Sequence, residues 1–148
     1  MKSRRSWHRP IIALLLVLPL LAVAEQGAPA KKSDAYIRGE KVYERCAACH
    51  ALDSDRTGPR HCGIVGRRAG SVPGFSYSPA MRRSKIVWTE ENLDRFLKAP
   101  VAAIPGTAMG YDGIKDDRER HDLIRYLREA GLEAKCQALL ANAEKLVR

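Results

Sequence analysis

The chain has 148 residues, which is enough for one domain with a single hydrophobic core. Its net charge is +9, and it becomes +5 without the first 24 residues, because these contain four of the 26 basic residues and no acidic one. A charge this modest argues against the strongly basic surface that is typical of a nucleic-acid-binding protein. It favours transient association with acidic protein patches or an anionic membrane surface, mainly through the rate of encounter.

The N-terminal segment has the three parts of an export signal. A basic stretch is followed by an apolar run over residues 11–23, and a small-x-small cleavage pattern ends at Ala24. An uncleaved membrane anchor is the alternative, but the run is interrupted by Pro19 and is shorter than the roughly 20 residues that span a bilayer. We predict a cleaved signal peptide over residues 1–24, a periplasmic mature protein and a flexible arm over residues 25–33.

Helical periodicity dominates the mature chain. Apolar residues recur at helical spacing in four segments, residues 34–45, 89–99, 116–131 and 132–148. Thr89 suits the N-cap of the second helix, Pro100 ends that helix, and Gly131 suits the end of the third. The sequence predicts a mainly α fold, with one domain over residues 34–131 and a short extra helix in a C-terminal extension over residues 132–148.

The stretch between the first two predicted helices is irregular. Residues 51–83 are rich in Gly, Pro, Ser and Arg and follow neither helical nor strand periodicity. Such a long irregular stretch is unusual in a compact domain unless something other than secondary structure organises it. Aromatic residues make up only 6% of the chain, which is sparse for a core built from side chains alone. An enclosed apolar prosthetic group would account for both observations.

The motif with the most chemical content is Cys46-Ala47-Ala48-Cys49-His50. Two cysteines three residues apart reach the two vinyl groups of one haem, and the adjacent histidine supplies an axial imidazole, so this spacing is the attachment signature of c-type haem. A thiol redox pair lacks its βαβ context here, and a zinc site lacks a second cysteine pair. The motif therefore predicts one covalent haem c, with His50 as an iron ligand.

The sixth iron ligand is predicted from a loop punctuated by Pro105, Gly106 and Gly110, which contains Met109. A methionine usually fills core space, but one in such a loop, without periodic apolar neighbours, is hard to explain as packing. Met81 is the competing candidate. Ligation by His and Met fills both axial positions, which favours electron transfer over gas or substrate chemistry.

Six blocks together resemble class I cytochrome c of the mitochondrial and long bacterial type: CAACH (46–50), TGP (57–59), GIVGRRAG (63–70), FSYSPAM (75–81), IPGTAMGYDGIKDD (104–117) and RERHDLIRYL (118–127). The resemblance implies the cytochrome c fold, in which helices and long loops wrap around one covalent haem. It also implies that the carbonyl of Pro59 binds the distal ring nitrogen of His50 and that Thr107 stabilises the loop of Met109. Three residues match positions that hydrogen-bond a buried haem propionate: Arg67, Tyr77 and Trp88.

Two positions depart from the family pattern. Phe96 stands where a tyrosine is usual near the methionine ligand, and His61 stands where a leucine normally packs beside the haem. Either the imidazole of His61 faces solvent, or the surrounding loop is rebuilt.

The predicted function is that of a one-electron carrier. Such a protein shuttles electrons between respiratory or dehydrogenase partners through an exposed haem edge, and we expect a monomer that is not an enzyme. Two alternatives are a haem subunit of a larger redox complex and a haem sensor or peroxidase-like protein with a labile sixth ligand.

The remaining cysteines, Cys62 and Cys136, can be interpreted in two ways. A disulfide between them would pin the C-terminal helix to the altered loop, which an oxidising compartment allows. The alternative is two separate buried thiols.

Overall fold

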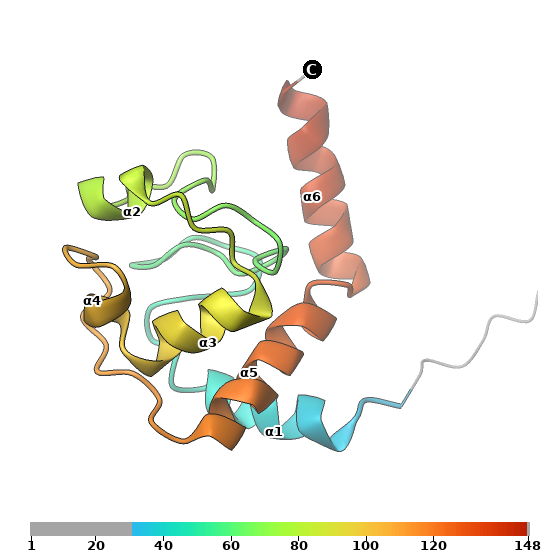
Figure 1. The fold of residues 1–148 in the computed structure, drawn as a ribbon. Coiled ribbons are helices and arrows are strands. Elements are labelled where there is room, and N and C mark those ends of the chain that lie inside the picture. Colours follow the sequence, from blue (N-terminus) through green and yellow to red (C-terminus); the bar gives the residue numbers. More distant parts are fainter. Residues whose placement is uncertain (1–30, 148) are drawn as a thin grey trace, which may run out of the picture. The chain divides into compact units, whose positions relative to one another are not determined.

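The computed structural model describes residues 31–147. It contains six helices in this range, shown in Figure 1: α1 (Asp34–Tyr43), α2 (Pro79–Arg83), α3 (Glu90–Lys98), α4 (Pro100–Ala103), α5 (Asp117–Ala130) and α6 (Ala134–Val147). The described residues form no regular strand, only an isolated antiparallel bridge between Arg68 and Val87. No helix in the described part of the chain is both long and apolar enough to cross a membrane. The predicted signal peptide and the arm up to residue 30 lie outside the described residues.

Side-chain caps fix the starts of the predicted helices. The Thr89 hydroxyl accepts a hydrogen bond from the Asn92 amide at the start of α3 (3.1 Å), and Asp116 accepts one from the Glu119 amide at the start of α5 (2.8 Å). Ser33, which we had placed in the flexible arm, caps α1 in the same way. Gly131 ends α5 as predicted, but its φ of −62° is right-handed and not the left-handed conformation common at such positions.

Helices α1 and α5 cross at a point of backbone contact (Figure 1). Gly39 makes this approach possible, because a Cβ on it would lie 2.0 Å from the carbonyl oxygen of Asp122. The ring of Tyr126 packs beside the contact against those of Tyr36 and Tyr43, with centroid distances of 5.0 and 5.1 Å. These contacts set the position of α1, and therefore of the segment that follows it.

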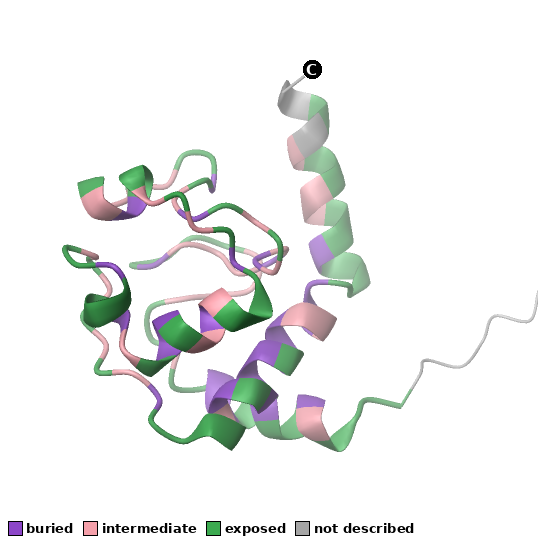
Figure 2. Ribbon diagram, in the orientation of Figure 1, coloured by how far each residue is buried: buried purple, intermediate pink, exposed green. Residues whose placement is uncertain are grey.

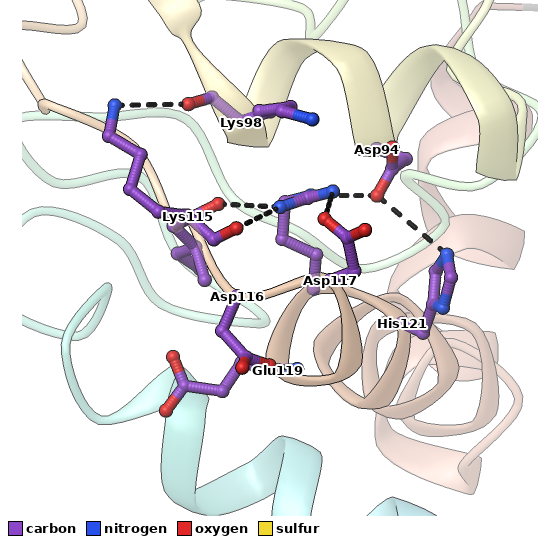
Figure 3. Close-up of polar contacts among 9 residues, drawn as sticks. Asp94, Lys98, Lys115, Asp116, Asp117, Glu119 and His121 are labelled. Atoms are coloured by element: carbon purple, nitrogen blue, oxygen red, sulfur yellow. Dashed lines mark hydrogen bonds and ion pairs between the residues drawn. The ribbon is translucent and has the colours of Figure 1, made fainter.

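A buried arginine ties α5 to α3 and to the preceding loop (Figure 3). Arg120 is only 2% exposed, and its guanidinium donates to Asp94 of α3 (2.7 Å) and to Asp117 (2.5 Å). It also donates to the carbonyl oxygens of Ile114 (2.9 Å) and Lys115 (3.0 Å). The carboxylates and carbonyls compensate for the burial of the charge, so the loop before α5 is fixed to both helices.

The C-terminal helix α6 attaches to the irregular region and not to another helix. A disulfide joins its Cys136 to Cys62, with 5.1 Å between the Cα atoms. An ion pair between Lys135 and Asp53 (2.6 Å) lies beside it. Most of the other α6 residues whose burial is described are exposed (Figure 2). The disulfide is therefore the main anchor of this helix.

We expect the double variant Cys62→Ser/Cys136→Ser to lose about 4 kcal/mol of unfolding free energy, because the bond closes a long loop in the unfolded chain. Guanidinium denaturation of the haem-loaded protein measures the loss. Lys135→Ala is the matched control: it removes the neighbouring ion pair, keeps the disulfide, and should change stability by less than about 1 kcal/mol. Equal stabilities for the two variants would contradict the anchoring role.

Candidate functional site

Residues of α1, α2, α3 and α5, together with the irregular region and the loop before α5, line a cavity of about 480 Å³, a size typical of cofactor sites. Its wall is mostly apolar and includes side chains of α3 and α5: Leu93, Phe96, Leu97, Leu123 and Leu127. The nine residues that the sequence predicts to contact a haem all line this one cavity: Cys46, Cys49, His50, Pro59, Arg67, Tyr77, Trp88, Thr107 and Met109. Residues from distant parts of the chain are thus brought to a single enclosed site.

The thiols lie on a turn directly after α1. The amides of Cys49 and His50 both bond to the carbonyl oxygen of Cys46, at 3.1 and 2.9 Å, which places all three side chains on one short turn. Both thiols are free, and burial raises the pKa of Cys46 to about 11. A protonated thiol is a poor metal ligand and a poor redox nucleophile. No cluster of three His, Cys, Asp or Glu side chains able to hold a metal ion occurs among residues 31–147.

The imidazole of His50 is held by the segment that follows the turn. Its Nδ1 lies 2.8 Å from the carbonyl oxygen of Pro59, the contact that the family resemblance implies. A proton on Nδ1 donated to this carbonyl leaves the Nε2 lone pair for a metal. Burial lowers the pKa of His50, which favours the neutral form that a ligand requires. Gly58 also packs on the ring: a Cβ there would lie 2.2 Å from Cε1.

His61 is not a solvent-facing residue, so the first of our two alternatives is wrong. Its ring stacks on that of His50, with centroids 4.2 Å apart and planes inclined by 21°, and it lines the cavity. Tyr43 meets the His61 ring edge-on at 5.7 Å. Burial lowers the pKa of His61 well below its usual value, so the ring is neutral at ordinary pH.

Met109, the predicted sixth ligand, lies in the loop between α4 and α5. The amide of Met109 donates to the hydroxyl of Thr107 (3.3 Å), and Gly106 has the positive φ (+86°) that this tight loop requires. Met81 of α2 lines the same cavity, so position alone does not separate the two methionines. Met81 is, however, a buried part of the core at 8% exposure, whereas Met109 is only partly buried and packs against that core.

Two of the three residues predicted to bind a propionate, Arg67 and Tyr77, have polar groups that can take a further hydrogen-bond partner. Arg67 donates to the carbonyl oxygens of Cys62 (2.8 Å) and Arg60 (2.9 Å), and among the ion pairs of the described residues none involves it. Burial lowers the pKa of Arg67, which reflects the cost of a charge without a carboxylate partner. The hydroxyl of Tyr77 accepts from the Val72 amide (3.3 Å), so its own proton is free for a second partner. A bound carboxylate would satisfy both groups.

A family model for cytochrome c matches residues 36–131. The chain belongs to the cytochrome c family. Cytochrome c2 of Blastochloris viridis is 39% identical over 117 residues, which cover 77% of this chain and 91% of that protein. Cytochrome c type-1 of Ascaris suum is 47% identical over 97 residues, or 64% of this chain and 87% of its own. The solved structure of cytochrome cH from Methylobacterium extorquens aligns with a TM-score of 0.62 and 35% identity, covering 64% of this chain and 97% of that one.

Membership in the cytochrome c family confirms the predicted fold and cofactor. The domain is a mainly α cytochrome c fold, and the protein binds a covalent c-type haem for electron transport. The apolar cavity, with two free thiols and a neutral imidazole in its wall, fits such a group. Helix α6 lies beyond the residues that the family model matches.

Proposed function

We propose that this chain is an exported one-electron carrier whose haem is attached through Cys46 and Cys49 and ligated by His50 and Met109. One observation carries the proposal: both thiols, His50 and Met109 line the same apolar cavity. The bond from His50 to the Pro59 carbonyl supports it, because the nitrogen left over is the one that can bind iron.

When bound, the haem supplies one-electron exchange between Fe(III) and Fe(II). Cys46 and Cys49 would hold the haem through thioether bonds, which would prevent its dissociation. His50 and Met109 would bind the iron, which would leave no open metal site for a substrate. The protein therefore acts as a carrier and not as an enzyme.

The cavity wall has two further tasks in this proposal. Its leucines and Phe96 exclude water from the haem. Arg67 and the free hydroxyl proton of Tyr77 bind a propionate, and Trp88 lines the same cavity. A charged guanidinium compensates for burying a carboxylate better than a neutral donor does.

The proposed location is the periplasm, after cleavage of residues 1–24. The remaining charge of +5 steers the carrier towards acidic redox proteins, and transiently towards an anionic membrane surface. A second candidate function, a haem subunit of a larger redox complex, is favoured by the largely exposed α6. A free carrier purifies as a monomer, whereas a subunit copurifies with its partners.

The test is a redox titration of the mature protein after coexpression with c-type maturation factors. We expect haem that survives denaturing extraction, a reversible one-electron Nernst curve and a monomer in size-exclusion chromatography. The Cys46→Ala/Cys49→Ala variant controls for attachment and should release any haem on extraction. Extractable haem in the wild-type protein, or a stable complex with another redox protein, would refute the carrier proposal.

A further inference from the structure

His61 makes two ring contacts that link the predicted iron ligand to the core. Its ring is nearly parallel to that of His50, at a centroid distance of 4.2 Å and an angle of 21°. Its other aromatic neighbour, Tyr43, meets it edge-on at 5.7 Å and 66°. A parallel stack restricts rotation of both rings, because turning either one brings its atoms into the other.

The backbone of His61 is held as firmly as its side chain. Its amide donates to the carbonyl oxygens of Ala51 and Leu52, both at 3.0 Å. The next residue, Cys62, is disulfide-bonded to Cys136 of α6. The imidazole of His61 is therefore a fixed surface against which the ring of His50 rests.

The rings of Tyr43 and His61 each carry a buried polar atom without a hydrogen-bond partner. The Tyr43 hydroxyl and Nδ1 of His61 are the two buried side-chain polar atoms without a hydrogen-bond partner among the described residues. An unpaired buried polar group is costly, so each normally has a partner or a bound water. The Tyr43 hydroxyl has a proton to donate, and Nδ1 of an imidazole accepts a hydrogen bond when the ring proton is on Nε2.

We propose that His61 is a positioning residue that fixes the rotational angle of the His50 imidazole about its bond to iron, and that one buried water bridging the Tyr43 hydroxyl and Nδ1 of His61 holds the His61 ring in place. The inference rests on the proposed ligation of haem by His50. The orientations of the imidazole and of the methionine sulfur together determine how electron spin is distributed over the four haem methyl groups in the ferric state, so turning the imidazole changes that distribution. His61 therefore acts on the haem through His50, as outer partners of metal ligands do.

Three variants test this role in the haem-loaded protein. His61→Leu removes the flat ring at similar volume, His61→Phe keeps a flat ring without nitrogens, and Tyr43→Phe removes only the hydroxyl. The readout is the set of paramagnetically shifted haem-methyl signals in the proton NMR spectrum of the ferric protein. We expect His61→Leu to reorder or compress these shifts, His61→Phe to restore the wild-type order, and Tyr43→Phe to broaden the signals through added ring mobility.

The outcomes separate this inference from the proposed function. Wild-type shifts in His61→Leu would overturn the positioning role, and so would equal changes in His61→Leu and His61→Phe. The optical band of methionine bound to Fe(III) is recorded for every sample. Its absence from the wild-type protein would refute the proposed ligation instead, whatever the haem-methyl pattern of the variants.

Discussion

Replacing Gly39 by alanine should lower the free energy of unfolding by about 3 kcal/mol, near the upper end of what overpacking costs. The new Cβ would lie 2.0 Å from the Asp122 carbonyl oxygen and 2.7 Å from Cβ of Tyr126. Neither atom belongs to a flexible side-chain end, so α1 and α5 must move apart. Alanine is the better helix former by about 1 kcal/mol, and the clash must first exceed that gain.

Guanidinium denaturation followed by far-UV circular dichroism measures the Gly39→Ala effect. Glu40→Ala is the matched control, because it changes the adjacent exposed residue of α1 and should stay within about 0.5 kcal/mol of wild type. If the close approach of the two backbones sets the spacing of α1 and α5, the two variants should differ strongly in their free energy of unfolding. A Gly39→Ala protein as stable as the control would show that the crossing of α1 and α5 can relax.

Replacing Gly58 by alanine should dislodge the imidazole of His50 without detaching the haem. The added Cβ would lie 2.2, 2.5 and 2.6 Å from Cε1, Nδ1 and Nε2 of that ring. The ring must turn or shift, which breaks its 2.8 Å bond to the Pro59 carbonyl. Loss of such an outer partner lowers metal affinity by about 10- to 100-fold. We expect much of the ferric protein to become high-spin, with the thioether bonds intact.

Optical and electron paramagnetic resonance spectra of the ferric protein measure this change. Gly110→Ala is the control, because Gly110 lines the same cavity but a Cβ there meets no atom within 4 Å. It should keep the low-spin spectrum. If Gly58→Ala also keeps it, the contact between Gly58 and His50 does not constrain the ligand.

The long helices could be predicted from sequence because each has several turns of apolar periodicity, and α1, α3 and α5 also begin at a polar cap. Helices α2 and α4 were missed, since five and four residues are too few to show a period. Ser78 followed by Pro79 was the available signal for α2, as a capping residue before a proline in the first turn. Spacing alone does not show which apolar residues of α1 are buried: Ile37 is 53% exposed, whereas the neighbouring Tyr36 is buried against Tyr126.

Site residues that lie together in one sequence motif could be predicted, whereas contacts that arise from packing between separate segments could not. Cys46, Cys49 and His50 follow from one short motif, and the Pro59 contact follows from family resemblance. The stacking of His61 on His50 joins two segments of the chain, and no pattern in either segment encodes it. The buried Arg120 was likewise hidden in a charged stretch that resembles a solvated helix face. Only the three-dimensional arrangement reveals these roles.

The most direct test of His50/Met109 ligation is the ferric optical spectrum of the wild-type protein and of two methionine variants, with carbon monoxide added after reduction. We predict that the wild-type protein and Met81→Leu show the weak long-wavelength band of methionine bound to Fe(III) and do not bind carbon monoxide readily. Met109→Ala should lose the band and bind the gas. If Met81→Leu loses the band and Met109→Ala keeps it, the ligand is Met81. If the wild-type protein lacks the band or binds the gas readily, the sixth position is open, and a sensor or enzyme replaces the carrier.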